Sequence, residues 1–246
     1  MITRLDPQST IGELVTERPG RSRVFERLNV DYCCGGKLPL AEACEKRGLD
    51  VDTVLAQLQQ ADAEADVRDA SLADADAMGL TELADHIEQT HHAYLRSELP
   101  RLDQMTEKVY RVHGESDPRL AEVRWAFTAL KHELESHMPK EEQILFPIIR
   151  RMEAEGRSVQ TPFGSIAQPI AQMELEHEQA GDALATIREA TDGYRPPLWA
   201  CNTYRAMLDA LRQLEQDMHQ HVHKENNVLF PKALELEAQL ARKERV

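Results

Sequence analysis

Apolar residues recur at alternating steps of three and four in the second half of the chain, which is the spacing of one buried helix face. The clearest series runs through Phe127, Leu130, Leu134, His137, Glu141, Ile144 and Ile148. Two further series run through Ile170, Met173, His177, Ala180, Leu184 and Ile187, and through Leu211, Leu214, Met218, His221, Glu225 and Val228. With their caps and glycine stops, these patterns predict four helices over residues 81–113, 118–155, 167–192 and 199–241. We therefore expect an all-α protein built around an up-down four-helix bundle.

The first sixty residues carry shorter helical patterns with their own start and stop signals. A capping box from Thr10 to Glu13 opens one helix, and Pro19-Gly20 closes it. Further short helices are predicted over residues 22–28, 40–47 and 51–59. Residues 63–80 hold five acidic residues against one basic residue and lack an apolar period, so they are predicted to form a solvated linker. The expected organisation is a small helical domain (1–62), a linker (63–80) and a bundle (81–246).

The composition supports the helical prediction and argues against several classes of protein. The 246 residues include 11 Gly and 12 Pro, too few for the closely spaced turns of an all-β protein. Acidic residues number 43 and basic residues 29, and the net charge of −14 argues against binding to nucleic acid or to an anionic membrane. The amino terminus lacks the apolar core of a signal peptide, so we expect a cytoplasmic protein. The sequence neither requires nor excludes a homo-oligomer.

Polar residues interrupt three of the apolar series at mid-height, and they are all histidine or glutamate. A buried unpaired ion costs several kcal/mol, and two buried glutamates would repel each other. No Lys or Arg occupies the middle of these series to neutralise them. A His and a Glu four residues apart lie on one helix face and supply two convergent ligands. The pattern therefore indicates a metal site inside the bundle.

An internal repeat strengthens this interpretation. The segments SHMPKEEQILFP (136–147) and QHVHKENNVLFP (220–231) share His, Lys, Glu, Leu, Phe and Pro at matching positions. Another histidine precedes each pair by a similar interval, 45 residues from His92 to His137 and 44 from His177 to His221. Four His and two Glu exceed the needs of one structural zinc ion. They predict a di-iron site with two bridging carboxylates and room for an oxo or hydroxo bridge and an exogenous ligand.

The other histidines need separate interpretation. The spacing leaves His91 and His92 open as alternatives, since His91 continues the apolar series before it and His92 heads the series after it. His219 and His223 form a competing pair but lie beside the apolar series, which places them on the outer face of the bundle. The remaining three are expected to be surface groups or to contact ligands from outside: His86, His113 and His132.

Several residues near the predicted ligands have two interpretations. Glu133 and Glu176 could hydrogen-bond a ligating imidazole or relay protons, or be ordinary exposed helix residues. Pro139 lies between His137 and Glu141 and removes one backbone hydrogen bond, so the helix is expected to kink or unwind there, unless the fold simply tolerates it.

Four cysteines complete the candidate chemistry. Cys33 and Cys34 are adjacent and are followed by Gly35-Gly36, so they do not belong to a secreted disulfide framework. A short loop would expose their thiols, which favours a redox, metal-handling or nitrosyl-handling role over simple packing. Cys44 and Cys201 are expected to be buried small apolar residues.

These residues resemble the di-iron RIC family, whose name stands for repair of iron centres. The resemblance covers nearly the whole chain: DYCCGG is similar to the small domain of that family, and HMPKEEQILFP and HVHKENNVLFP are similar to its two hemerythrin-like metal motifs. It implies two non-haem iron ions, bridged by Glu141 and Glu225, and favours His92 over His91. The implied ligands are His92, His137, Glu141, His177, His221 and Glu225.

The resemblance also implies a function. It indicates a cytoplasmic stress protein that helps to restore iron–sulfur clusters damaged by nitric oxide or oxidants by supplying iron, with iron–sulfur proteins as clients and nitric oxide or oxygen as small ligands. One ligand fewer than in oxygen-carrying hemerythrins argues against reversible oxygen carriage. Two other functions stay open: a di-iron oxidoreductase acting on nitric oxide or peroxide, and an oxygen or nitric oxide sensor whose small domain moves.

Overall fold

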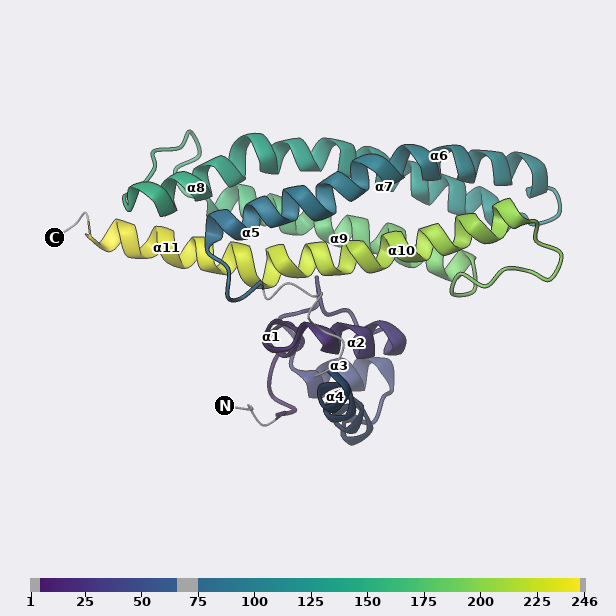
Figure 1. Cartoon of the computed structure of the whole chain (residues 1–246), viewed down its shortest axis with the longest axis horizontal. Helices are drawn as coiled ribbons and strands as arrows, with labels where there is room; N and C mark the ends of the chain where they lie inside the picture. Colours follow the sequence, from purple (N-terminus) through teal and green to yellow (C-terminus); the bar gives the residue numbers. More distant parts are fainter. Residues whose placement is uncertain (1–4, 66–74, 244–246) are drawn as a thin grey trace.

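Four long helical rods form the main part of the molecule in this computed structural model, which describes residues 5–65 and 75–243 (Figure 1). The first rod is α5 (Leu80–Ile87), η3 (Glu88–His92) and α6 (Ala93–His113). The second is α7 (Arg119–Lys140), η4 (Glu141–Leu145) and α8 (Phe146–Glu155), and the third is α9 (Ala167–Ala190). The fourth is α10 (Asn202–Lys224), η5 (Glu225–Leu229) and α11 (Phe230–Lys243). The predicted all-α bundle is confirmed.

The bundle core consists of two apolar clusters with a polar layer between them. One cluster extends from Leu95, Leu134 and Met218 towards the α6–α7 end, and the other extends from Ile87 and Leu145 towards the opposite end. Each predicted ligand lies in sequence between a member of one cluster and a member of the other. Apolar packing on both sides therefore excludes water from the layer that holds the histidines and glutamates.

Three of the rods contain a π-helical turn at the level of this polar layer. In η4 the N–H of Phe146 bonds to the carbonyl of Glu141, and in η5 the N–H of Phe230 bonds to that of Glu225, five residues back in each case. Pro147 follows the first turn and cannot donate an α-helical hydrogen bond, and the repeat has a proline at the same position in the second. Single π turns of this kind are frequent at functional sites.

Pro139 is not the shared cause of these turns. The local unwinding expected near Pro139 does occur: the π-helical turn η4 begins at Glu141, directly after α7. However, η5 has the same geometry although His223 takes the position equivalent to Pro139. The π turn therefore belongs to the repeat as a whole, and Pro139 is tolerated near the end of α7.

The small domain packs short helices around its own apolar core. These are α1 (Ile11–Glu17), η1 (Pro19–Arg21), α2 (Ser22–Leu28), α3 (Leu40–Arg47) and α4 (Val51–Ala65). The predicted capping box is present, with the Thr10 hydroxyl accepting from the N–H of Glu13 and the Glu13 carboxylate accepting from that of Thr10. α4 continues past the predicted end at residue 59 into the region expected to be linker. The middle of that linker, residues 66–74, lies outside the described residues.

One buried arginine ties the helices of the small domain together. Arg21 is 1% exposed, and its guanidinium donates to both carboxylate oxygens of Asp62 on α4, at 2.9 and 2.7 Å. It also donates to Glu17 at 2.7 Å and to the carbonyl of Leu14 at 3.0 Å. A buried charge with this many partners costs little to bury and would be expensive to leave unpaired.

The small domain lies against the fourth rod at the level of η5 (Figure 1). Asn227 of η5 fits between Gly12 and Gly36, where an added Cβ would come within 2.4 and 2.3 Å of its Oδ1. Its Nδ2 donates to the carbonyl of Cys33 at 3.0 Å. The two glycines therefore permit an approach that places the cysteine loop next to the residues that follow Glu225.

Among the described residues, none of the helices combines the length and the apolar character that crossing a bilayer requires.

A carboxylate from a neighbouring rod caps the start of α5. Glu153 of α8 accepts hydrogen bonds from the N–H groups of Leu80 and Thr81, both at 2.8 Å. Burial acts to raise the pKa of Glu153, but these hydrogen bonds outweigh it and hold the pKa below its ordinary value of 4.5.

We expect Glu153→Gln to lower the free energy of unfolding by about 1 kcal/mol at pH 7, since a neutral amide caps the helix less well. Because the folded-state pKa is depressed, the stabilisation is present above about pH 4.5 and is lost as the pH falls through the folded value. The difference between variant and parent in urea unfolding should therefore close at low pH. A difference that persists at low pH would show that the charge is not its origin; Glu155→Gln serves as control.

Candidate metal centre

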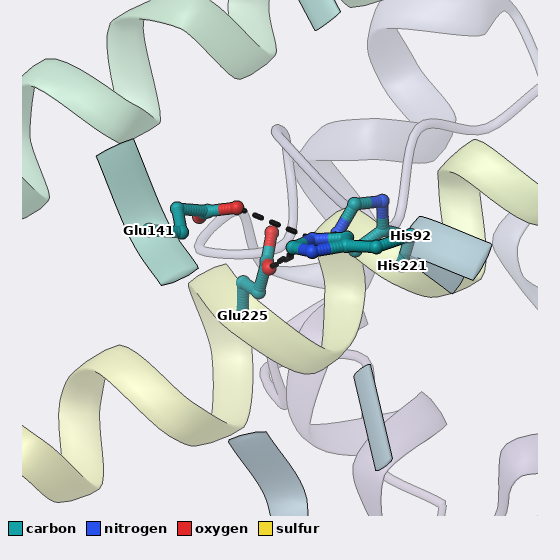
Figure 2. Close-up of side chains that lie close together, drawn as sticks. All are labelled: His92, Glu141, His221 and Glu225. Carbon is teal, nitrogen blue, oxygen red and sulfur yellow. Dashed lines mark hydrogen bonds and ion pairs between the residues drawn. The ribbon is translucent and has the colours of Figure 1, made fainter. Parts of the chain in front are cut away.

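Six buried side chains from all four rods converge in the polar layer of the bundle. They are His92 of η3, His137 of α7, Glu141 of η4, His177 of α9, His221 of α10 and Glu225 of η5, each at most 2% exposed. They form two groups of four ligand atoms within 4.8 Å of one another, and both groups contain Glu141 and Glu225. Figure 2 shows one group, with the side chains of His92, Glu141, His221 and Glu225 pointing toward one another. This is the arrangement of a carboxylate-bridged di-metal site.

The glutamates face both groups. Oε1 of Glu225 lies 3.0 Å from Nε2 of His221, while its Oε2 lies 3.2 Å from Nε2 of His177. Oε2 of Glu141 lies 3.4 Å from Nε2 of His92 and 3.3 Å from Nε2 of His137. A carboxylate placed in this way can bridge two ions, one on each side.

The imidazole spacing fits paired ligands of one ion. The Nε2 atoms of His92 and His221 are 3.1 Å apart, and those of His137 and His177 are also 3.1 Å apart. Two nitrogens about 2.1 Å from a metal and at right angles to each other would be about 3.0 Å apart. We call the space beside His92 and His221 position one, and the space beside His137 and His177 position two.

Unsatisfied polar atoms support the same conclusion. Among the described residues, both carboxylate oxygens of Glu141, Oε2 of Glu225 and Nδ1 of His221 are buried without a hydrogen bond of good geometry. Burying a carboxylate in this way costs several kcal/mol. Cations bound between the two carboxylates would remove that cost, so the residues present fit a pair of metal ions.

The two carboxylates are held in their ionised form. Burial and the neighbouring Glu225 act to raise the pKa of Glu141, but His137 and His92 outweigh them and lower it. Burial likewise opposes ionisation of Glu225, yet His221 and His177 lower its pKa well below the ordinary value. For His137, burial acts to lower the pKa, but the two glutamates raise it to about 9. Deprotonated carboxylates are the form that metal binding needs.

Three of the four imidazoles are oriented through their outer nitrogen. Nδ1 of His92 contacts Glu142 at 2.7 Å, and Nδ1 of His177 contacts Asn226 at 2.8 Å. Sequence analysis missed both partners, although each directly follows a bridging glutamate in the repeat. Nδ1 of His137 contacts Glu176 at 2.7 Å, so of the two interpretations of Glu176 the hydrogen bond to an imidazole fits the structure. Such partners orient the ring and raise its basicity as a ligand.

Glu133 does not take the comparable role. It is half-buried and, among the described residues, makes no hydrogen bond with any of the four imidazoles. Of its two interpretations, the ordinary helix residue fits the structure.

His91 and His92 take different places. His92 points into the polar layer, whereas His91 is turned away and contacts Asp217 at 2.9 Å and the Lys224 ammonium at 2.8 Å. The His91 ring stacks on the ring of His221, with centroids 5.2 Å apart and an interplanar angle of 3°. The structure therefore brings His92 into the site and leaves His91 packed behind one of its neighbours.

The remaining histidines follow the predictions only in part. His219 and His223 do lie outside the bundle core, but the small domain covers them, and His223 is only 6% exposed. Both rings pack edge-on against Tyr32, which sequence periodicity within one helix could not reveal. His132 is exposed, while His86 and His113 are half-buried. His86 accepts from the Lys224 ammonium at 2.9 Å.

The prediction for Cys201 was wrong, whereas that for Cys44 is confirmed. Cys44 is buried in the small-domain core. Cys201 is exposed at the N-cap position, directly before α10, and Nε2 of His113 lies 3.3 Å from its sulfur. The backbone N–H of Tyr204 and the His113 ring lower the pKa of this thiol.

The adjacent cysteines lie directly outside the polar layer. The Cys34 thiol donates to the backbone carbonyl of His177 at 3.5 Å. A cavity of about 120 Å³ is lined by both cysteines together with Asn226 and Asn227. The loop expected to expose them instead buries Cys33 and leaves Cys34 half-buried, because the small domain is docked on η5.

Comparison with known proteins now places the chain in a family. Residues 83–233 match the hemerythrin HHE cation binding domain, and residues 7–62 match a domain of unknown function, DUF542. The iron–sulfur cluster repair proteins YtfE of Escherichia coli O1:K1, of Escherichia coli SMS-3-5 and of Escherichia fergusonii are each 40% identical over 228 residues. These matches cover 91% of this chain and 96% of each relative. The chain belongs to the YtfE family of iron–sulfur cluster repair proteins.

Membership of the YtfE family confirms the resemblance inferred from the DYCCGG segment and the two metal motifs. It also agrees with the order of the two parts of the chain, since the DUF542 match precedes the hemerythrin match. The bridged di-metal arrangement is thus found in a chain whose family carries a cation-binding domain over the same residues.

We expect Asn226→Ala to weaken metal binding about 10- to 100-fold, because His177 loses the partner that orients its ring. Asn227→Ala is the matched control, since the adjacent side chain contacts the cysteine loop and no ligand. It should leave metal affinity unchanged but speed alkylation of Cys33. Equal metal affinity in both variants, measured by competition with a chelator, would contradict the assigned role of Asn226.

Proposed function

We propose that the protein repairs iron–sulfur clusters damaged by oxidative or nitrosative stress by supplying iron from a non-haem di-iron centre. The observation that carries this proposal is the pair of glutamates shared by two histidine groups, with each oxygen of Glu225 directed at a different group. The family relatives named as iron–sulfur cluster repair proteins support the activity. Client iron–sulfur proteins are the partners.

The proposed ligands are the four histidines and two glutamates described above. His92 and His221 would hold one iron, His137 and His177 the other, and Glu141 and Glu225 would bridge them. The bound irons, with an oxo or hydroxo bridge, would supply a site for oxygen or nitric oxide and a store of releasable iron. Nitrogen and oxygen ligands alone suit manganese as well, and the named activity of the relatives favours iron.

The two positions hold their ions unequally. His137 and His177 in position two both have a hydrogen-bond partner at Nδ1, one of them the carboxylate of Glu176. In position one, Nδ1 of His221 has no hydrogen bond among the described residues, and its ring stacks on His91, beside the Lys224 ammonium. A ligand without a partner binds more weakly. Iron should therefore leave position one first.

The adjacent cysteines would act as acceptors for the released iron or for a nitrosyl group. Cys34 lies against the backbone of His177, so little distance separates the thiols from the di-metal centre. Soft thiolates compete well for iron against nitrogen and oxygen ligands. This contact favours transfer through Cys33 and Cys34 over release directly into solvent.

We expect Glu141→Leu and Glu225→Leu each to lower iron content by at least about half, because each substitution removes a bridge and leaves the other carboxylate short of positive charge. Iron per chain and the visible absorption of anaerobically purified protein would measure this. Glu178→Leu, on α9 but outside the centre, is the control. Full iron retention in both bridge variants would refute the assignment.

The repair activity itself is tested by restoring a nitric-oxide-damaged iron–sulfur enzyme with iron-loaded protein and no added iron. We expect restoration of the enzyme to rise in proportion to the iron released, and to be lost in Glu225→Leu. Many turnovers of nitric oxide or peroxide per centre, without restoration of the client, would instead identify an oxidoreductase.

A chelator should remove the two irons in two phases, with position one emptying first. His221→Ala should abolish the fast phase, whereas Glu176→Gln should speed the slow phase because His137 loses its carboxylate partner. Stopped-flow absorbance of the chelator complex would follow both. A single phase that releases both irons of the parent protein would show that the two positions are equivalent.

A further inference from the structure

A groove of about 880 Å³ runs between the small domain and the outer surface of α9 and α10. α2 and the loop that follows it form one wall, and residues of the two bundle helices form the other. Both Cys33 and Cys34 line it, and Cys34 is half-buried there. Its size falls within the range of small-molecule sites, about 300–1,000 Å³.

The lining of this groove is rich in arginine, although the chain has a net charge of −14. The six arginines are Arg23, Arg27, Arg47, Arg188, Arg195 and Arg212. Arginine is the side chain best suited to bind carboxylate and phosphate groups in pairs of hydrogen bonds. Their guanidinium groups can pair with the carboxylates of an anionic ligand.

Carboxylates line the groove as well. The acidic residues are Glu26, Asp31, Glu178, Asp182 and Glu215, so the arginines outnumber them by one. Glu215 pairs with Arg188 at 2.8 Å, and Glu26 accepts from the Tyr32 hydroxyl at 3.0 Å. Arg195 and Arg212 each pair with an aspartate outside the groove. Within the described residues, Arg27 and Arg47 form no ion pair, so these two arginines are placed to contact an anionic ligand.

The cysteine pair has the spacing of metal ligands. The Sγ atoms of Cys33 and Cys34 are 3.9 Å apart, close to the roughly 3.8 Å edge of a tetrahedral site with metal–sulfur bonds of about 2.3 Å. Oδ1 of Asp31 lies 3.1 Å from Sγ of Cys33. These three ligand atoms lie within 4.8 Å of one another. A four-coordinate ion held here would need one more ligand from outside the chain.

We propose that the groove binds ferrous iron in the form of a small anionic polycarboxylate complex, whose carboxylates contact the arginines and whose iron passes to Cys33, Cys34 and Asp31. The inference rests on the proposed function, because it names the source from which spent iron is replaced. A carboxylate of the carrier would complete the coordination during transfer.

The transfer is a ligand exchange without electron transfer. Three iron–oxygen bonds to the carrier or to water break, while two iron–sulfur bonds and one iron–oxygen bond to Asp31 form. Each thiol loses its proton to solvent as its sulfur binds, and the iron remains Fe(II). The freed carboxylates stay paired with arginine until the carrier leaves the groove.

The test uses full-length protein whose bundle centre is already loaded, mixed anaerobically with Fe(II) citrate or with uncomplexed Fe(II). Thiolate-to-iron charge-transfer absorption measures iron arrival at the cysteines. We expect Arg27→Gln/Arg47→Gln to slow uptake from citrate about 10-fold at low ionic strength, with the effect lost at high salt. Uptake of uncomplexed Fe(II), a cation, should be as fast or faster.

Two controls separate this outcome from a folding defect. Arg151→Gln/Arg157→Gln removes the same charge from exposed positions away from the groove and should change neither rate. Cys34→Ser should abolish the absorption while leaving iron in the bundle centre unchanged.

Equal rates of iron uptake from Fe(II) citrate in the parent and in the Arg27→Gln/Arg47→Gln variant would overturn the proposal. Equal slowing of uptake from Fe(II) citrate and from uncomplexed Fe(II) would overturn it as well. The measurement contains no client cluster, so it does not depend on repair. If iron uptake depends on these arginines but a damaged enzyme is not restored, the proposed role of the groove stands and the proposed repair function is rejected.

Discussion

The burial of two carboxylates side by side is the constraint on which the rest of the structure depends. Glu141 and Glu225 are 0% exposed, repel each other, and are surrounded by four imidazoles rather than by Lys or Arg. The imidazoles offset part of that repulsion, and cations held between the carboxylates would remove the rest. The π turns place the two glutamates, the flanking apolar clusters exclude water, and the partners at Nδ1 orient the rings. Each feature serves the same electrostatic requirement.

The repeat makes the two halves of the centre similar but not identical. Glu142 and Asn226 are equivalent partners, one for each lone histidine. Glu176 and His91 also take equivalent places before those histidines, yet one is a carboxylate that contacts His137 and the other a ring that stacks on His221. Under the proposed function, this difference between the two halves of the repeat would let one ion leave before the other.

The same η5 turn links the metal centre to the small domain. Glu225 begins this turn, Asn226 orients His177, and Asn227 holds the loop that carries Cys33. Three consecutive residues therefore connect a bridging ligand with the cysteine pair. The bridging ligand and the cysteine loop are therefore linked through a single helical turn. The burial of His223 and the half-buried state of Cys34 both follow from this docking.

The sequence by itself determined the helical bundle and the level at which its polar residues meet, because helix periodicity depends on neighbours three and four positions away. The repeat also pointed to the paired His and Glu residues. Tertiary structure alone decided between His91 and His92 on geometric grounds, exposed Cys201, and placed Cys34 beside His177. These outcomes depend on contacts between segments that are about 90 to 140 residues apart. The spacing of residues within one helix does not determine which distant segment packs against that helix.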